Sequence, residues 1–268
     1  MKLRHAVLVA LFLFVPLPAF GGDAALPPVA PPTITQLGEA MQATFGADRP
    51  KQWGEAIQGV VTRLTASPEG EKRVALTLDA CEGVTDMRIV ALLRKHTIPA
   101  TIFVTNRWLR ANPKVAADLA ADPLFTFACH GKRHKPASVN GKLAFGIRGT
   151  RSVPALVEEV EDNARAIAEL TGKRPTWYRS GTAFYDDVAV RVITELGLRI
   201  AGYTVSADAG ATLPAAKVAR LLVAAPDGAI ILCHINHPES GTYAGLAKAV
   251  PVMLEKGVRF VPLEEAEK

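Results

Sequence analysis

Cysteine is scarce in this chain of 268 residues, and its number is odd. Three cysteines cannot all pair within one molecule, so a disulfide framework is excluded and a packed core has to stabilise the fold. The composition allows this, because 49% of the residues are hydrophobic and 21% are charged. These values exclude a disordered, collagen-like or coiled-coil chain, and we expect one domain of the size of a small enzyme.

The chain also lacks two signals of nucleic-acid and nucleotide binding. Its 31 basic and 26 acidic residues give a net charge of +5, but the basic residues form no run that would bind a nucleic acid. No glycine-rich loop of the kind that holds a phosphate follows any strand-like segment. We therefore expect neither a nucleic-acid partner nor a nucleotide cofactor.

No hydrophobic run reaches the roughly 20 residues that a membrane-spanning helix needs. The apolar stretch from Ala6 to Phe20 follows a basic start and ends in prolines and small residues, so residues 1–21 are predicted to be a secretory signal peptide. No cysteine follows this stretch, which excludes a lipoprotein. We expect a periplasmic or secreted protein with no stable membrane anchor after cleavage; an uncleaved N-terminal anchor is the alternative.

The rest of the chain divides into two parts. Residues 22–58 are rich in proline and alanine, contain one short helical pattern around Leu37 to Phe45, and are predicted to be a linker and N-terminal extension outside the core. Residues 59–268 alternate strand-like and helical patterns and are predicted to be the catalytic domain. The strand-like runs lie at 59–65, 73–79, 100–104, 125–129, 175–179, 199–205, 229–233 and 258–261. The helical patterns lie at 85–95, 152–170, 188–196, 214–224 and 243–256.

This alternation predicts an α/β fold. Most of the strand-like runs are apolar on both faces, which is typical of a parallel sheet covered by helices. We expect a distorted (β/α) barrel of about seven parallel strands rather than an open doubly wound sheet.

Polar side chains follow five of these strands, at the point where each strand ends. They are Asp79, His130, Arg179, Asp208 and His234. In parallel β/α folds the chemistry is carried by the carboxyl ends of the strands, so five such residues predict a site at one face of the sheet.

Two of the histidines have a spacing that suits a metal ion. His130 and His134 are four residues apart, and both rings can face one ion if the segment makes a helical turn. Imidazole is a ligand for zinc and similar divalent ions. A carboxylate from another strand, Asp79 or Glu82, would complete a set of two histidines and one carboxylate.

At this point a family resemblance is evident. Residues 72–263 resemble the polysaccharide deacetylases of the NodB-homology group, carbohydrate esterase family four. The matching segments occur in the family's order: Thr77-Leu-Asp-Ala-Cys-Glu-Gly83, His130-Gly-Lys-Arg-His134, Tyr178-Arg-Ser-Gly181, Asp208 and Leu232-Cys-His234.

The resemblance implies a metal-dependent hydrolase that removes acetyl groups from N-acetylated sugars, so the expected partner is a carbohydrate. It implies a divalent ion, with zinc expected, held by His130 and His134. Asp79 would be the general base and Arg179 would hold it in place. His234, oriented by Asp208, would be the general acid. A backbone N–H near Tyr185 would contribute to the oxyanion site.

The sequence departs from the family at the third metal ligand. The second aspartate of the family's first motif is Ala80 here, and alanine binds no metal. We favour Glu82 as the substitute because its longer side chain can offset a displaced loop. Asp79 is the alternative ligand, and a non-catalytic protein with an impaired metal site is a further alternative. Gly131 replaces a serine or threonine, and the Arg179 motif lacks the family's prolines.

The three cysteines lie beside these motifs. Cys129 and Cys233 each precede a site histidine, and neighbouring side chains of a strand point to opposite faces, so we expect both thiols to be buried and to point away from the site. Cys81 is adjacent to the missing aspartate and is a further candidate ligand, because thiolate binds zinc well.

Three functions remain open from the sequence. The first is a deacetylase of an N-acetylglucosamine-type polysaccharide or oligosaccharide. The second is hydrolysis of a non-sugar amide or imide on the same scaffold, and the third is carbohydrate binding without catalysis. We expect His237 to be an ordinary loop residue, and the aromatic residues near Arg179 (Trp177, Phe184, Tyr185) to belong to the core or to a sugar-stacking face.

Overall fold

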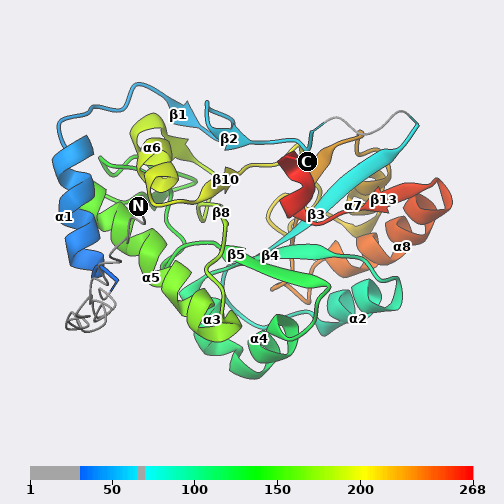
Figure 1. Cartoon of the computed structure of the whole chain (residues 1–268). Helices are drawn as coiled ribbons and strands as arrows, with labels where there is room; N and C mark the ends of the chain where they lie inside the picture. The colour runs from blue at the N-terminus through cyan, green and yellow to red at the C-terminus, as the bar shows by residue number, and fades with distance from the viewer. Residues whose placement is uncertain (1–30, 66–69, 268) are drawn as a thin grey trace, which may run out of the picture. The chain divides into compact units, whose positions relative to one another are not determined.

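The computed structural model describes residues 31–65 and 70–267 (Figure 1). The predicted signal peptide therefore lies outside the described residues. From Pro32 onward the chain forms one compact unit.

The centre of this unit is a sheet of nine strands in which all neighbouring strands run parallel. The strand order is β11-β12-β3-β4-β5-β8-β10-β2, and β13 pairs with the first half of β3. The strands are β2 (Val60–Val61), β3 (Lys72–Ala80), β4 (Ala100–Val104), β5 (Phe125–Cys129), β8 (Trp177–Tyr178), β10 (Arg199–Ala201), β11 (Val205–Ser206), β12 (Ala229–His234) and β13 (Val258–Phe260). The predicted α/β fold with a distorted parallel barrel is confirmed.

The barrel closes at residues 199–205, which the sequence pattern predicts to form one continuous strand. The run 199–205 is split, since β10 pairs with β8 and β2 whereas β11 pairs with β12 on the other side of the opening. The split falls at Gly202, where a Cβ atom would lie 2.9 Å from the side chains of Val60 and Thr62. Glycine allows the chain to pass this close to β2. An antiparallel bridge between Arg63 and Ala229 closes the remaining gap.

The two faces of the sheet have different neighbours, as β3 illustrates. Leu76 and Leu78 belong to the large core between the sheet and the helices, whereas Ala75 belongs to a smaller core with side chains from other strands, such as Phe103 and Trp177. Successive side chains of a strand alternate between faces. Asp79 is therefore on the interior face of the barrel with Ala75.

Helices cover the outer face of the sheet, and several of them begin at a residue whose side chain caps the first turn. Ser152 accepts a hydrogen bond from Ala155 N at the start of α5, which ends at Gly172 with φ of 72°. Asp186 caps α6 in the same way. The helices are α1 (Ile34–Phe45), α2 (Met87–Lys95), α3 (Asn106–Ala111), α4 (Pro113–Ala120), α5 (Val153–Thr171), α6 (Asp187–Glu195), α7 (Ala215–Val223) and α8 (Thr242–Glu255), with the 3-10 helix η1 (Leu263–Glu267) near the end.

Two helices and two small sheets are additional to the elements expected from the sequence. Helix α3 begins at Thr105, whose hydroxyl accepts a hydrogen bond from Trp108 N, and α4 begins with Pro113 in its first turn. The small sheets pair β1 (Trp53–Gly54) with β9 (Tyr185–Asp186) and β6 (Leu143–Ala144) with β7 (Ile147–Arg148).

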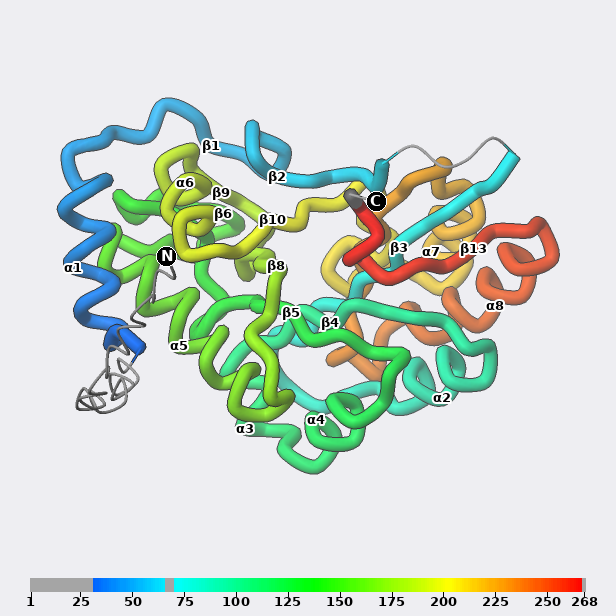
Figure 2. Tube along the Cα trace, in the orientation of Figure 1, coloured from blue at the N-terminus to red at the C-terminus, as the bar shows by residue number. Residues whose placement is uncertain are grey.

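The expectation that residues 22–58 stay outside the core is wrong for their described part. Helix α1 lies along α5 (Figures 1 and 2), and Gly38 approaches so closely that a Cβ there would lie 3.3 Å from Pro154 Cβ. Phe45 is buried in the large core, and Leu37 and Met41 pack against it. The N-terminal segment is therefore part of the packed body.

Within residues 31–65 and 70–267, no helix combines the length and the apolar character that crossing a membrane requires.

Candidate active site

The five polar residues predicted at strand ends lie at one end of the barrel. Asp79 and His234 are within β3 and β12 and pair across the two strands. His130, Arg179 and Asp208 follow β5, β8 and β11 by one or two residues. Because all these strands are parallel, their carboxyl ends meet, and side chains that are distant in the sequence come together.

Arg179 holds Asp79 by a buried ion pair. Its Nη1 donates to Asp79 Oδ1 at 2.7 Å and to Thr77 Oγ1 at 2.9 Å, and the guanidinium is fully buried. Its Nη2 donates to Gly202 O at 2.8 Å, so the split between β10 and β11 supplies an acceptor for this side chain. Burial raises the pKa of Asp79, but the charge of Arg179 outweighs it and holds the pKa below its usual value. Asp79 is therefore an ionised acceptor at neutral pH.

His130 presents a free ring nitrogen to the same space. Its Nδ1–H donates to Arg179 O at 3.0 Å. This hydrogen bond leaves Nε2 facing Cys81 Sγ at 3.5 Å and Asp79 Oδ2 at 3.6 Å. Burial lowers the pKa of His130, but the charges of Asp79 and Cys81 outweigh it and raise the pKa. A metal ion that binds through Nε2 in this orientation takes the place of the proton that the neighbouring negative charges favour there.

The segment from His130 to His134 forms no helical turn, so that part of the prediction is wrong. It is a bent loop in which Gly131 has φ of 86° and His134 has φ of 61°. The two rings still come together, with centroids 4.9 Å apart. A left-handed non-glycine residue is strained, and such residues occur where the surroundings impose them.

Two side chains of α5 impose the shape of this loop. Asn163 Oδ1 accepts hydrogen bonds from His130 N at 2.9 Å and Gly131 N at 3.0 Å. Glu159 Oε1 accepts from Arg133 N at 2.7 Å and Lys135 N at 3.2 Å. A Cβ at position 131 would lie 2.6 Å from Glu159 Oε1, which explains the glycine where the family has serine or threonine.

The third residue beside the two histidines is Cys81. The ligand atoms of Cys81, His130 and His134 all lie within 4.8 Å of one another. Among the described residues, no other group of three or more potential metal ligands is this close together. Burial opposes ionisation of Cys81, but the charge of His130 and hydrogen bonds with His130, His134 and His234 outweigh it. They hold the pKa of the thiol well below its usual range.

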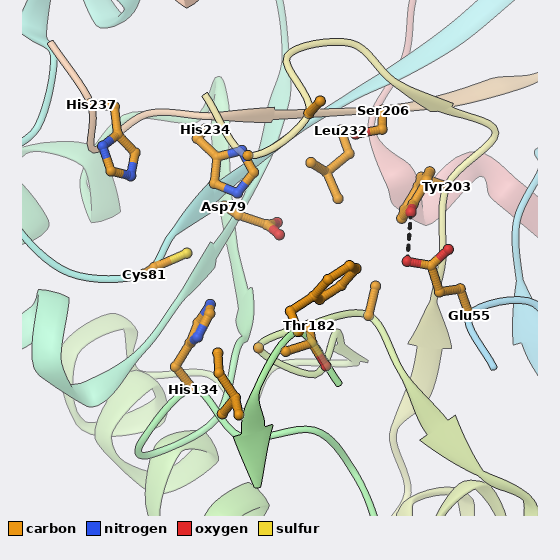
Figure 3. A pocket seen from close by; sticks show the side chains of 16 residues that line it. Glu55, Asp79, Cys81, His134, Thr182, Tyr203, Ser206, Leu232, His234 and His237 are labelled. Carbon is orange, nitrogen blue, oxygen red and sulfur yellow. Dashed lines mark hydrogen bonds between the residues drawn. The ribbon is translucent and has the colours of Figure 1, made fainter. Parts of the chain in front are cut away.

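Glu82, the favoured carboxylate of the sequence analysis, is elsewhere. Its side chain is 67% exposed and pairs with Arg107 at 3.2 Å. Ala80 is buried in the large core, on the face of β3 that is opposite to Asp79. A carboxylate at position 80 would therefore point toward the helices. The chain leaves β3 after Ala80, and the next residue, Cys81, turns back to the histidines (Figure 3).

The predicted pair of His234 and Asp208 is also formed. Asp208 Oδ1 accepts a hydrogen bond from His234 Nδ1 at 3.0 Å, and Asp208 Oδ2 accepts from His234 N at 2.6 Å and from Thr242 Oγ1 at 2.9 Å. Burial lowers the pKa of His234, but hydrogen bonds with Asp208 and Cys81 raise it well above its usual value. His234 is therefore suited to carry a proton at neutral pH.

Of these residues, Asp79, Cys81, His134 and His234 line one cavity of about 520 Å³. Figure 3 shows Cys81, His134, Asp79 and His234 around its inner end. The size is ordinary for a site that encloses a small ligand. His237, expected to be an ordinary loop residue, lines the cavity beside His234.

Several lining residues were missed or misplaced by sequence reasoning. Glu55 and Tyr203 lie on the far side of the cavity, and Phe145 lines it with 77% of its side chain exposed. Trp177 and Tyr185 are buried, and residues 181–183 line the cavity instead of Tyr185. The sequence carried no signal for Glu55, because it lies in a segment without strand alternation or a motif.

Cys129 and Cys233 are free thiols buried in the large core, so the expected orientation away from the site is confirmed. Burial raises the pKa of both thiols. They are therefore inert neighbours of the site histidines.

The parallel barrel brings histidines, a carboxylate and an arginine together at its carboxyl end. The profile of the polysaccharide deacetylase family matches residues 66–201, and the chain belongs to this family.

Similar proteins have low sequence identity. The uncharacterised protein YlxY of Bacillus subtilis is 23% identical over 160 residues, which are 59% of this chain and 46% of that protein. The chain thus spans less than half of the length of this relative.

The solved structures share the fold. Wild-type BA3943 of Bacillus anthracis, described as a pseudoenzyme of carbohydrate esterase family four, superposes with a TM-score of 0.62 at 22% identity, covering 74% of this chain and 66% of its own. PdaA of Bacillus subtilis, a family 4 carbohydrate esterase, has a TM-score of 0.63 at 16% identity, covering 85% and 87%.

Proposed function

We propose that this protein is a metal-dependent N-deacetylase of an N-acetylglucosamine-type polysaccharide or oligosaccharide. The observation that carries the proposal is a cluster of three side chains able to bind a metal ion (Cys81, His130, His134) at a cavity that is also lined by an ionised carboxylate (Asp79) and a proton-bearing imidazole (His234). Family membership supports the same reaction class.

Cys81, His130 and His134 would hold the ion. One thiolate and two imidazoles are a ligand set that zinc accepts, with Zn–S of about 2.3 Å and Zn–N of about 2.0–2.1 Å, and three protein ligands leave a position open. Ligand atoms within 4.8 Å of one another can meet these distances after small side-chain rotations. The bound ion would polarise the amide carbonyl and stabilise the developing negative charge.

The remaining residues move the protons. Asp79, kept ionised by Arg179, accepts a proton from the water molecule that attacks the amide carbonyl. His234, kept protonated by Asp208, donates a proton to the departing nitrogen through Nε2. The C–N bond breaks, and the products are acetate and a free amine.

We also propose that the protein is exported to the periplasm or secreted, because residues 1–21 have the features of a signal peptide. A polysaccharide substrate outside the cytoplasm is consistent with this location.

The test measures metal content and acetate release for wild type, Cys81→Ala, Glu82→Ala and His134→Ala. We expect wild type and Glu82→Ala to carry one ion and to release acetate from an N-acetylglucosamine oligomer, whereas Cys81→Ala and His134→Ala lose both. Cys233→Ala is the control for removal of a thiol outside the site. Metal loss in Glu82→Ala with retention in Cys81→Ala would assign the third ligand to Glu82 instead.

A non-catalytic carbohydrate-binding protein is the second candidate. It is favoured by the absence of the family's second aspartate, since the side chain at that position, Ala80, faces the core. A metal-free wild type that binds the oligomer without releasing acetate would establish this function. A third possibility, hydrolysis of a non-sugar amide or imide, would appear as metal-dependent turnover of such a compound without acetate release from sugars.

A further inference from the structure

Glu55 forms part of the active-site wall although it lies outside the segment matched by the family profile. It follows β1 in the N-terminal segment and lines the same cavity as Asp79, Cys81 and His234. Figure 3 shows it across the cavity from His134 and Cys81. A substrate bound in this cavity therefore has this carboxylate as part of its surroundings.

The backbone that leads to Glu55 is held in place by contacts just before β1 and within it. Lys51 N and Gln52 N donate hydrogen bonds to Asp187 Oδ1 at 2.7 and 2.9 Å. Gly54 pairs with Tyr185 in β9, and the Trp53 ring lies 5.5 Å from that of Phe184. These contacts attach the segment to the loop that follows Arg179, so the position of Glu55 is coupled to the site.

The carboxylate of Glu55 has a neutral partner. Tyr203 Oη donates a hydrogen bond to Glu55 Oε1 at 2.9 Å (Figure 3). Burial raises the pKa of Tyr203, and the hydrogen bond to Glu55 raises it further, so the phenol keeps its proton. The other carboxylates of the site differ, since Asp79 pairs with Arg179 and Asp208 with His234. Among the described residues, none forms an ion pair with Glu55.

An acidic group of this kind fits a cation. An ammonium group has three N–H donors, and the second carboxylate oxygen of Glu55 and the lone pairs of Tyr203 Oη are acceptors on the same wall. The proposed reaction produces such a group, because removal of an acetyl leaves an amine that is protonated near neutral pH.

We propose that Glu55 is a specificity-determining residue that recognises the ammonium group of an already deacetylated sugar next to the one being hydrolysed. The preferred substrate is then a partly deacetylated chain, and successive reactions on one polymer occur next to each other. This inference rests on the proposed function, because it assumes the deacetylation reaction. The binding of an ammonium group by Glu55 does not depend on that reaction.

The experiment compares two oligomers of equal length, one fully N-acetylated and one with a single free amine, for wild type, Glu55→Gln and Glu82→Gln. The measured quantity is the ratio of kcat/KM for the cationic oligomer to that for the neutral one. We expect a ratio of about ten in wild type, as a hydrogen bond to a charged group would give, and a ratio near one in Glu55→Gln. Glu82→Gln, which also removes an exposed negative charge, keeps the wild-type ratio. The ratio falls with added salt in wild type but not in Glu55→Gln.

A loss of activity that is equal for both oligomers in Glu55→Gln overturns the inference, because it indicates a contact with a hydroxyl or a structural role. Calorimetric binding of a fully deacetylated oligomer separates this failure from failure of the proposed function. If no variant releases acetate but wild type binds this oligomer about tenfold more tightly than Glu55→Gln does, the reaction is wrong and the recognition stands. If acetate is released and the binding is equal, the recognition is wrong and the reaction stands.

Discussion

Two groups of residues around the cavity use histidine in different ways. The proposed metal side, called the metal side below, consists of Cys81, His130 and His134, and the proposed acid side, called the acid side, consists of Asp208 and His234. His130 follows β5 directly and His234 ends β12. The Nδ1 of His130 donates to a neutral backbone carbonyl, whereas the Nδ1 of His234 donates to a carboxylate. The first arrangement leaves an acceptor nitrogen for an ion, and the second stabilises a protonated ring.

The two sides also differ in what holds them. The backbone of the metal side is held by Asn163 and Glu159, two side chains of α5. The acid side is held by Thr242, the first residue of α8, and by the backbone N–H of His234 itself. A histidine at a strand end thus acquires its role from the acceptor at Nδ1, and that acceptor comes from a different part of the chain in each case.

The largest expected effect separates the two sides. His130→Ala should abolish both metal binding and activity, because it removes a ligand from the three-residue cluster. His234→Ala should keep its metal while kcat falls by about 10²- to 10⁴-fold, the usual contribution of a general acid. Metal analysis and acetate release on the two variants measure this difference. Loss of metal from His234→Ala would show that the two sides are one site.

A smaller effect is expected for Asp208→Asn. The Asp208 carboxylate raises the pKa of His234, so its replacement by a neutral amide lowers that pKa. A general acid works below its pKa, and the alkaline decline of activity should therefore move to lower pH. The loss of kcat at neutral pH should be up to about 10²-fold. A pH profile of kcat with unchanged metal content checks this, and an unshifted alkaline decline would contradict the assignment of His234.

On the metal side, Asn163→Ala should weaken metal binding although Asn163 is not itself a ligand. The change removes the acceptor of the Gly131 N–H and one of the two acceptors of the His130 N–H, which keeps its hydrogen bond to Val104 O. We expect metal affinity to fall by about 10- to 100-fold, as for other residues that orient ligands. Competition with a chelator measures the affinity. Equal affinity in Asn163→Ala and wild type would show that the loop is held without α5.

The smallest effect is expected for Cys129→Ala. This thiol precedes His130 but is buried in the large core. Metal content and activity should be unchanged, and the free energy of unfolding should fall by about 1 kcal/mol. Denaturant unfolding measures the stability. A loss of metal in this variant would mean that the strand end shifts when the core beneath it changes.

Most strands of the central sheet could be predicted from the sequence. The apolar runs that form β3, β4, β5 and β12 are long and buried on both faces, so local pattern and tertiary environment agree. The short elements could not be predicted, since β1 and β9 have two residues each and exist because of their pairing. Helices α3 and α4 give only a weak pattern because each is short and their boundary is Asn112-Pro113.

The order of motifs, the strand ends and the alternation of faces were determined by the sequence itself. A side chain's face within a strand depends only on its position, so the opposite orientations of Asp79 and Ala80 follow from their places in β3. Tertiary structure alone decided the rest. Where a strand ends, backbone torsions set by distant contacts direct the next side chains, so Cys81 rather than Glu82 meets the histidines. The loop of His134 depends on α5, and Glu55 is positioned in the cavity by contacts with residues 135 to 148 positions further along the chain.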